Sequence, residues 1–310
     1  MELSSLTERL RDQIVTALHV GRLTGGDRLP GIREIARDTG ANPRTVAKAF
    51  RQLEKEGLVE LRERSGIYVT KQDQWGGSLL EETGRWLGGI IVEAWKRNVR
   101  IPDLADLIRR CTRDTHIRAA CVAENEDDRR AICEELTENF GIASAAVSIA
   151  DVPARPRGPS ELPAALRQAD FVVTTPLHAG PARAAAETLG KPLVMVSLHP
   201  DLVTAIERRL SEGQLIVVCA DPRFGEQVRA IHGGQRPDRI RIVLAAEAGD
   251  LALLDPEQPV LLTRAAQDRL APKVNLTPLV PFVPFISPGS AREVAELMVR
   301  LHMEREHGAR

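Results

Sequence analysis

From residue 117 onward, the chain alternates short apolar runs with amphipathic stretches of helical periodicity. The apolar runs are IRAACVA, AAVSIA, DFVVTT, PLVMVSL, LIVVCA, RIRIVLA and PVLLT. Most are separated by stretches with helical spacing, such as DDRRAICEELTENFG and LVTAIERRLSEG. This alternation is typical of parallel sheets whose two faces are both covered by helices. It therefore predicts an α/β region with mostly parallel sheets.

The alternation is interrupted near LHPDL, residues 198–202. We therefore expect a two-lobed region over 112–310, with lobes at about 112–198 and 199–310. The last helical stretch, AREVAELMVRLHMERE, should pack across one lobe. Two small α/β lobes that face each other resemble the periplasmic binding proteins, an architecture that some repressors carry behind a winged helix as an effector sensor. This resemblance is one of topology and has no diagnostic motif.

The first seventy residues have a different pattern, with three helices and a β-hairpin. LTERLRDQIVTALHVG and GIREIARDTG are amphipathic helical stretches that end at glycines. A third helix begins with Asn42 as N-cap and Pro43 at the first helical position, and runs to Gly57. LVELRE and GIYVT are short strands joined by a tight turn. This order predicts a winged helix-turn-helix over residues 1–72.

The two faces of the third helix differ in chemistry. Apolar side chains recur on one face at helical spacing: Val46, Ala49, Phe50 and Leu53. The other face begins with hydrogen-bonding and cationic side chains: Asn42, Arg44, Thr45 and Lys48. In a helix-turn-helix, the N-terminal residues of the second helix reach base edges, where Arg suits guanine and Asn suits adenine. Taken alone, such a polar face is also compatible with simple solvation.

The segment GRLTGGDRLPGIREIARDTGANPRTVAKAFRQLEKEGLVELRERSGIYV, residues 21–69, resembles the GntR family of bacterial transcription regulators. That family reads G-x-L-x-x-G-D-x-L-P-x-x-R-E-L-A, then a recognition helix, L-E-x-E-G-L and a glycine-tipped wing. The NPRTVAKAFRQLEKEGL portion is most similar to the YtrA branch. The resemblance implies an operator-binding regulator, which would bind near-palindromic DNA as a homodimer.

The resemblance also implies particular DNA contacts. By motif position, Arg33, Asn42, Arg44 and Thr45 contact DNA, and Gly66 forms the wing tip that approaches the minor groove. Pro43 stands where other branches often carry a polar contact residue, which shifts the expected base contacts to Asn42 and Arg44. The full predicted set, with Lys48 from the helix face and Arg64 from the wing, is Arg33, Asn42, Pro43, Arg44, Thr45, Lys48, Arg64 and Gly66.

A helical segment is expected between the two regions, at about residues 73–111. KQDQWGGS is polar and glycine-rich, and LLEETGRWLGGIIVEAWKRNV and IPDLADLIRRC follow with apolar helical spacing. All three tryptophans of the chain lie between residues 75 and 95. In YtrA-like regulators a comparable helical pair dimerises. Packing of the same residues onto the chain's own C-terminal domain is the alternative.

Candidate effector-binding residues follow the expected strands. In open parallel sheets, ligands lie beyond the carboxyl ends of the strands, near helix N-termini. The polar residues at these positions are Glu124, Asn125, Thr174, Thr175, His178, Ser197, His199, Asp221, Arg223, Thr263 and Arg264. Each one alone is equally compatible with helix capping or turn formation. Aromatic residues make up only 3% of the chain, so stacking platforms are scarce and a small polar or anionic effector is favoured.

Bulk properties exclude several classes of protein. The formal net charge is −1 over 310 residues, so any DNA binding must be local. The four cysteines form no C-x-x-C pair, which argues against a metal site. MELSSLTERLRDQ lacks the apolar core of a signal peptide, and the apolar runs are too short or interrupted to span a bilayer. We expect a cytoplasmic protein with no metal and no cofactor.

The sequence also argues against an enzyme. It contains no G-x-G-x-x-G, P-loop, G-x-S-x-G or H-E-x-x-H motif. The spacing of His178, His199 and Asp221 does not distinguish an acid–base group from turn residues. The prediction is therefore a DNA-binding transcription regulator controlled by a small-molecule effector. Two alternatives remain, namely an α/β domain that serves as a ligand-free assembly or protein-docking module, and an enzyme domain fused to a DNA-binding domain.

Overall fold

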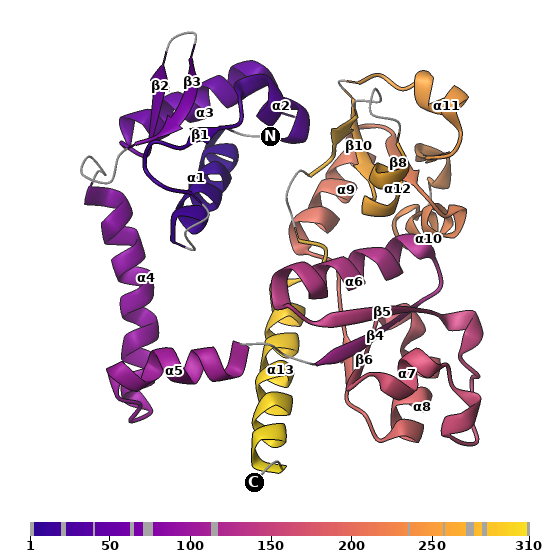
Figure 1. Cartoon of the computed structure of the whole chain (residues 1–310). Coiled ribbons are helices and arrows are strands. Elements are labelled where there is room, and N and C mark those ends of the chain that lie inside the picture. Colours follow the sequence, from indigo (N-terminus) through magenta and orange to yellow (C-terminus); the bar gives the residue numbers. More distant parts are fainter. Residues whose placement is uncertain are drawn as a thin grey trace. The chain divides into compact units, whose positions relative to one another are not determined.

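The computed structural model divides into two compact units, Met1–Ile108 and Arg109–Arg310, which are described separately (Figure 1). The structure describes residues 3–19, 23–39, 41–62, 65–70, 77–112, 117–234, 236–256, 258–270, 276–280 and 284–308.

The first unit begins with three helices and a small antiparallel sheet. The helices are α1 (Leu3–His19), α2 (Ile32–Thr39) and α3 (Pro43–Lys55). The strands, in the spatial order β1-β3-β2, are β1 (Arg28–Leu29), β2 (Val59–Arg62) and β3 (Gly66–Val69). One apolar cluster holds all these elements together, with Leu6, Leu10, Val46, Phe50, Leu53 and Ile67 among its buried members. This is the predicted winged helix-turn-helix, with β1 as a short strand that the sequence pattern did not reveal.

Local chemistry sets both ends of α3. The Asn42 side chain accepts a hydrogen bond from the Arg44 N–H at 2.9 Å, which caps the helix ahead of Pro43. At the other end, Gly57 adopts a left-handed φ of 75°. The Leu58 N–H then returns to the Leu53 carbonyl at 2.9 Å. The glycine thus stops the helix and turns the chain into β2.

Two further helices, α4 (Gly77–Lys96) and α5 (Ile101–Thr112), follow the winged helix. The turn between them contains Asn98 in a left-handed conformation with φ 58°. The N–H groups of Asn98 and Val99 donate to the carbonyls of Trp95 and Ala94, at 2.9 and 3.0 Å. The helical pair expected from the apolar spacing is therefore present.

The second unit contains two four-stranded parallel sheets. We call the parts built on them the first and the second α/β subdomain. The first sheet has the order β5-β4-β6-β7, with β4 (Arg118–Ala123), β5 (Ala143–Ser148), β6 (Phe171–Thr174) and β7 (Leu193–Met195). Its helices are α6 (Glu126–Phe140), α7 (Ala164–Gln168), α8 (Ala179–Leu189) and α13 (Pro288–Gly308), with 3₁₀ turns η2 (Ile149–Asp151), η3 (Pro159–Glu161) and η4 (Pro176–His178).

Successive residues of β4 and β6 face opposite sides of the first sheet, as the period of two requires. Cys121 and Val173 pack in a cluster with side chains of α6 and α13. Val122 and Val172 pack in a second cluster with side chains of α7 and α8. Both faces are therefore covered, which explains why these strands read as continuous apolar runs.

The second subdomain repeats this arrangement. Its sheet has the order β11-β10-β8-β9, with β8 (Leu215–Cys219), β9 (Ile240–Leu244), β10 (Pro259–Leu262) and β11 (Thr277–Pro278). Its helices are α9 (Pro200–Glu212), α10 (Pro222–His232), α11 (Ala248–Ala252) and α12 (Arg264–Arg269), with the 3₁₀ turn η5 (Pro237–Arg239). Side chains of α9 and α10 cluster on one face of this sheet, and side chains of α11 and α12 cluster on the other.

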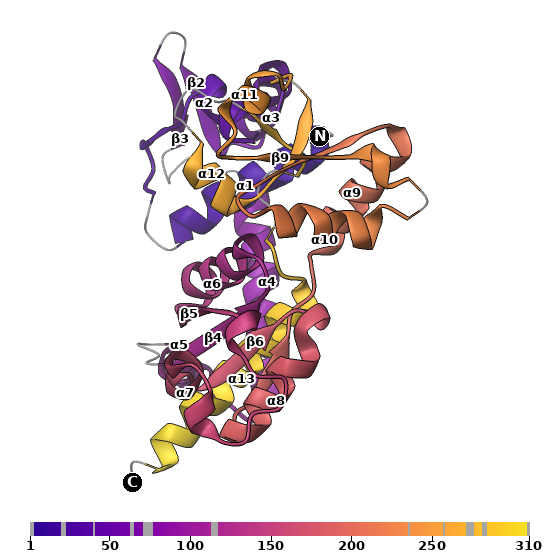
Figure 2. The ribbon, with the colours of Figure 1, turned by 90° about the vertical axis from the view of Figure 1, so that its right-hand side faces the viewer.

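Two chain segments cross between the subdomains, and they pair with each other. The first crossing follows β7, and the second precedes α13, whose Val294, Leu297 and Met298 pack on the first subdomain. Leu198 and Ile286 form an antiparallel bridge. Hydrogen bonds from the His199 N–H to the Phe285 carbonyl (2.9 Å) and from the Ser287 N–H to the Ser197 carbonyl (2.8 Å) flank it. Figure 2 shows the two subdomains one above the other.

The observed architecture confirms two predictions. The N-terminal region is a winged helix-turn-helix, and the C-terminal region is built from parallel sheets.

Candidate functional site

The first candidate site is the exposed N-terminal end of α3. Phe50 and Leu53 are fully buried in the domain core, so the opposite side of the helix faces outward. Arg44 and Lys48 are exposed on that side, and Thr45 is half-buried. No described residue forms a hydrogen bond or an ion pair with the Arg44 or Lys48 side chain. Two cationic groups are thus presented to solvent at the end of the helix that enters a major groove in helix-turn-helix proteins.

Neighbouring elements add further cationic groups. Arg33 lies exposed in the first turn of α2. At the wing, Gly66 has φ 125°, and a Cβ there would lie 3.1 Å from Nε of Arg28. The Arg28 side chain, which is not among the DNA contacts predicted from the sequence, therefore runs close to the wing turn. Arg64 lies outside the described residues.

Tyr68 makes two side-chain contacts within the wing. The Arg62 guanidinium lies 4.3 Å from the centre of the Tyr68 ring, at a cation–π distance. The hydroxyl groups of Tyr68 and Ser65 are 2.9 Å apart. Both contacts link Tyr68 of β3 to residues at the end of β2 and in the wing turn.

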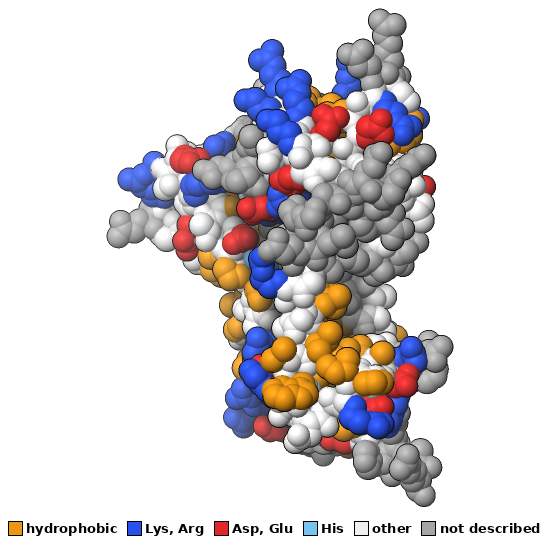
Figure 3. All heavy atoms as spheres, turned by 90° about the vertical axis from the view of Figure 1, so that its left-hand side faces the viewer, with side chains coloured by type: hydrophobic (Ala, Val, Ile, Leu, Met, Phe, Trp, Pro, Cys, Tyr) orange, Lys and Arg blue, Asp and Glu red, His pale blue; other side chains and the backbone are white. Residues whose placement is uncertain are grey.

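The helices α4 and α5 carry an unusual number of exposed large hydrophobic side chains. Trp86 and Trp95 are 64% and 67% exposed. The other exposed large side chains of this pair are Leu87, Val92, Ile101, Leu107 and Ile108. Figure 3 shows hydrophobic side chains gathered on this helical segment. A gathering of exposed apolar side chains of this kind is typical of a contact surface.

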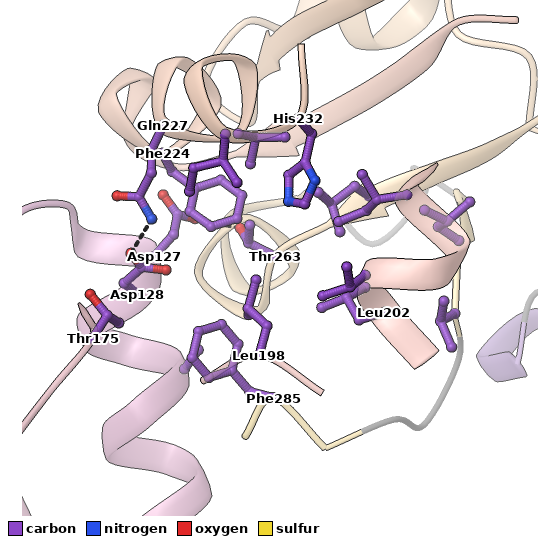
Figure 4. Close-up of a pocket in the computed structure, with 18 of the residues that line it drawn as sticks. Asp127, Asp128, Thr175, Leu198, Leu202, Phe224, Gln227, His232, Thr263 and Phe285 are labelled. Atoms are coloured by element: carbon purple, nitrogen blue, oxygen red, sulfur yellow. Dashed lines mark hydrogen bonds between the residues drawn. The ribbon is translucent and has the colours of Figure 1, made fainter. Parts of the chain in front are cut away.

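The second candidate site is a cavity of about 530 Å³ in the second unit. Its lining comes from α6 and η4 of the first subdomain, from α9, α10 and the end of β10 in the second, and from both crossing segments. Most lining side chains are apolar, including Leu198, Leu202, Ile206, Phe224, Val228 and Phe285. Figure 4 shows the rings of Phe224 and Phe285 among them. The volume is within the range of about 300–1,000 Å³ that is usual for small-molecule sites.

A buried carboxylate, Asp127, joins the two subdomains at one end of the cavity. It lies in the first turn of α6 and is only 2% exposed. Its oxygens accept hydrogen bonds from the N–H groups of Ala220 (3.0 Å) and Asp221 (2.8 Å), which follow β8. The Thr263 hydroxyl, which follows β10, is a third donor. The carboxyl ends of two strands in the second subdomain thus bind a carboxylate that the first subdomain supplies.

Asp128 is held differently. It is also 2% exposed, and its Oδ2 accepts from the side-chain amides of Asn125 (2.9 Å) and Gln227 (2.8 Å). Burial raises the pKa of Asp128, and this effect outweighs the opposing hydrogen bonds from Gln227 and Asn125. Close by in the lining, the Thr175 hydroxyl oxygen is buried and has no hydrogen-bond partner among the described residues.

Ion pairs reinforce the junction between the subdomains. Arg269 of α12 donates to Glu126 of α6 at 2.7 Å, and Arg264 donates to Glu138 at 2.9 Å. The Glu126 N–H also donates to the Asp221 carboxylate at 3.1 Å. Helix α6 therefore supplies these polar contacts of the first subdomain with the second.

Comparisons with known proteins identify the winged helix. A family model described as bacterial regulatory proteins, gntR family, matches residues 6–69. The HTH-type transcriptional regulator Rv1152 of Mycobacterium tuberculosis is 32% identical over 83 residues, which cover 27% of this chain and 69% of that protein. The chain belongs to the GntR family of bacterial regulatory proteins. The family resemblance carried by residues 21–69 is thus confirmed.

Relatives of the YtrA type are also similar to this GntR-family regulator. The HTH-type transcriptional repressor YtrA of Bacillus subtilis is 38% identical over 64 residues, and the chain spans about half of its length (49%). The solved structure of YtrA from Sulfolobus acidocaldarius, a GntR-family transcription factor, has 33% identity and a TM-score of 0.21, and the match covers 34% of this chain and 84% of that one. These matches cover about a third of the regulator or less, so they carry no information on the role of most of its second unit.

The predicted effector residues of the regulator fall into three groups. Four of them line the cavity: Thr175, Ser197, Thr263 and Arg264. Asn125 and Asp221 do not line it, but they form hydrogen bonds between the subdomains next to it. Asn125 donates to Gln227 of the second subdomain, and Asp221 accepts from the Glu126 N–H of the first. The remaining five, Glu124, Thr174, His178, His199 and Arg223, are not among the cavity-lining residues.

The residues outside the cavity have structural partners. The Thr174 hydroxyl donates to the Val122 carbonyl at 2.8 Å. His178 Nε2 accepts from the Glu124 N–H at 3.3 Å. His199 caps α9, and Arg223 pairs with Asp221 at 2.7 Å. Helix capping is therefore one role of His199. Asn125, Asp221 and Thr263 likewise cap α6, α10 and α12.

Three polar residues of the cavity lining were not predicted from the sequence. Asp127, Asp128 and Gln227 lie within helices, where acidic and amide side chains are ordinary. No described group of three or more His, Cys, Asp or Glu side chains is arranged to hold a metal ion. In the described part of the regulator, no helix is long and apolar enough to cross a membrane.

Proposed function

We propose that this GntR-family regulator binds a near-palindromic operator as a homodimer, and that a small molecule bound between its two α/β subdomains controls this binding. The observation that carries the proposal is the cavity of about 530 Å³, which the second unit encloses in the same chain as a DNA-binding winged helix. By analogy with the name of the YtrA repressor of Bacillus subtilis, we propose that the regulator acts as a repressor.

On DNA, α3 enters the major groove and presents Arg44 to base edges. The side-chain oxygen of Asn42 caps the helix, which leaves its NH₂ group as the donor for a base or a phosphate. Arg33 and Lys48 serve phosphates, and the wing at Gly66, with Arg28 beside it, approaches the minor groove. These assignments follow from exposed donors that have no partner among the described residues and from the usual docking of a helix-turn-helix.

The homodimer forms through α4 and α5 in this proposal. Aromatic side chains are the most frequent anchors of protein interfaces. Trp86 and Trp95 are nearly two-thirds exposed, and a second copy of the same helices offers a complementary apolar surface. A two-fold dimer also matches a near-palindromic operator.

The two α/β subdomains act as the two lobes of the sensor. Their relative position depends on the paired crossing segments and on the contacts that α6 makes with the second subdomain. A ligand that touches both subdomains favours the arrangement in which these contacts are made. Its effect on operator affinity can be no larger than the ratio of its own affinities for the two arrangements.

Operator selection from random DNA with the full-length protein tests the proposal first. The selected sites should contain two related half-sites, and affinity should fall steeply with salt because several phosphates are neutralised. Arg44→Ala should weaken binding to the selected site, whereas Arg208→Ala, an exposed charge of the second unit, should not. A pool that shows no half-site symmetry would refute the dimeric operator complex. A metabolite screen against this operator then tests effector control, which is refuted if no compound bound by the second unit changes operator affinity.

A further inference from the structure

The cavity between the two α/β subdomains has a chemistry that narrows the class of its ligand. Its body is apolar, with Phe224, Phe285, Leu198 and Leu202 among the lining side chains. Such a surface binds an apolar group, because the removal of both apolar surfaces from water is favourable. The ligand therefore needs a hydrophobic body.

The polar end of the cavity has acceptor atoms without donors. Both hydrogen bonds of the Asp128 carboxylate go to Oδ2, and no described residue donates to Oδ1. The buried Thr175 hydroxyl oxygen likewise has no described partner. Figure 4 shows both residues at the end of the cavity that α6 forms. A buried polar atom such as the Thr175 oxygen is rarely left without a partner, and Asp128 Oδ1 has capacity to accept a hydrogen bond. This end therefore fits a ligand head that donates hydrogen bonds.

The electrostatic balance of the lining favours a positive head. Asp127 and Asp128 are bound through neutral donors, namely backbone N–H groups, a hydroxyl and side-chain amides. Arg264, a cationic member of the lining, is paired with Glu138 at 2.9 Å. Burial lowers the pKa of His232, which keeps its imidazole neutral near pH 7.

One nearby group, His178, opposes the effect of burial on the pKa of Asp128. His178 stabilises the charged form of Asp128, although it does not line the cavity. Its contribution lowers the pKa of Asp128 and so favours the carboxylate form that a positive head would meet. The cavity thus holds two buried acids against one cation that is already paired, and an anionic head would add to the unbalanced negative charge.

We propose that the cavity binds an apolar amine, with its ammonium group between Asp128 Oδ1 and the Thr175 hydroxyl and its hydrophobic body against Phe224 and Phe285. The inference rests on the proposed sensor function and names the ligand class of that site. It replaces the small polar or anionic effector favoured by the composition of the chain. Charge-assisted hydrogen bonds to a desolvated carboxylate provide the selectivity for the head group.

The same geometry explains how the ligand links the subdomains. Asp128 and Thr175 belong to the first subdomain, whereas Phe224 and Gln227 belong to the second. An ammonium group at Asp128 neutralises the carboxylate that Gln227 also holds. The apolar body fills the space next to Phe224, so the amine binds best when both subdomains are in contact.

A matched ligand series tests the head group on the full-length protein. Diphenylpropylamine, diphenylpropanol and diphenylpropionate share a two-ring body and differ in a cationic, neutral or anionic head. We expect the amine to bind most tightly in isothermal titration calorimetry and to raise the melting temperature. Asp128→Asn should weaken the amine by about ten- to a hundredfold, as expected for a charge-assisted hydrogen bond, with little effect on the alcohol.

Two further variants keep the test decisive. Thr175→Val removes a hydroxyl that has no described partner, so the fold should tolerate it, and amine affinity should fall severalfold. Asp151→Asn removes an exposed carboxylate of the first subdomain and should change nothing. The proposal is overturned if the alcohol or the acid binds as tightly as the amine, if none of the three binds, or if neither Asp128→Asn nor Thr175→Val weakens amine binding.

The operator affinity, measured with the same ligands, separates this inference from the sensor function. If the amine binds through Asp128 but operator affinity does not change, the site is correct and the regulation by this ligand is refuted. If the acid binds instead and operator affinity changes, the sensor function is supported and the amine proposal is wrong.

Discussion

The exposed end of α3 and the polar end of the cavity use charge in opposite ways. At α3, the cations Arg44 and Lys48 face solvent without described partners. At the cavity, the carboxylates Asp127 and Asp128 are 2% exposed and are held by neutral donors. An exposed, unpaired cation costs little stability and is ready for a polyanion such as DNA. A buried carboxylate, by contrast, contributes to stability only through its donors, and its removal leaves them unsatisfied. Charge changes should therefore leave stability nearly intact in the first region and lower it in the second.

The largest effect is expected for Asp127→Ala. The substitution leaves the N–H groups of Ala220 and Asp221 and the Thr263 hydroxyl without their acceptor, and buried unsatisfied donors cost about 1–3 kcal/mol each before relaxation. We expect the free energy of unfolding of the second unit to fall by roughly 3 kcal/mol. Urea denaturation followed by circular dichroism measures it, with Asp151→Asn as control. Equal free energies of unfolding for Asp127→Ala and Asp151→Asn would contradict the expected difference between buried and exposed charges.

Arg44→Ala should instead change DNA binding and leave the fold intact. The loss of a base-contacting arginine costs about 1–3 kcal/mol of operator affinity and relaxes specificity at one position. The free energy of unfolding should change by no more than about 0.5 kcal/mol, because the side chain is exposed. Fluorescence anisotropy with operator and scrambled DNA measures both affinity and specificity. Equal losses on both DNAs would mean that Arg44 contacts only phosphates.

Lys48→Ala tests whether a second cation of the same helix contacts a DNA phosphate. If Lys48 contacts a phosphate, affinity should fall by a similar factor on all sequences, and the slope of log K against log salt should decrease in magnitude by about 1. A salt titration of wild type and variant measures the slope. An unchanged slope would remove Lys48 from the DNA contacts.

A pH dependence is expected from Asp128. Burial raises its pKa above the ordinary value of 3.8, so the folded state holds the proton more tightly than the unfolded state. Below 3.8 both states are protonated, and above the raised pKa both are ionised. Between these limits, stability falls as pH rises, because the unfolded state releases its proton first. Unfolding of wild type and Asp128→Asn should therefore diverge with rising pH, and parallel curves would contradict the assignment.

The smallest effect is expected for Glu93→Gln on α4. Hydrogen bonds from Lys96 and then Arg97 hold the pKa of Glu93 at about 2, yet its side chain is 56% exposed. Exposed ion pairs of this kind contribute little, since water and salt screen them. The melting temperature should be unchanged within error. A clear decrease would show that an exposed charge on this helix stabilises the protein or its dimer.

The contrast between the two regions also explains what the sequence revealed. The winged helix was predictable because its signals are local: Asn42, Pro43 and Gly57 delimit one helix, and Val46, Phe50 and Leu53 form its buried face. The parallel sheets were predictable because strands covered on both faces form continuous apolar runs. These signals need no knowledge of distant contacts.

The cavity could be located only in part. Thr175, Ser197, Thr263 and Arg264 were found because strand ends are recognisable in the sequence. Asp127 and Asp128 were missed, since acidic residues in the first turn of a helix are common and favourable. Their partners Asp221, Gln227 and Thr263 are 94 to 136 residues away along the chain. No local pattern reports contacts of that separation.

The operator affinity of Asp127→Asn tests most directly whether the second unit controls the first. The substitution weakens the contacts between the α/β subdomains without touching the winged helix, and no ligand needs to be known. With folding verified by circular dichroism, we predict that anisotropy titration shows an operator affinity changed at least about fivefold, a typical coupling between distant sites, while Asp151→Asn behaves as wild type. A folded Asp127→Asn protein with wild-type operator affinity would contradict the account.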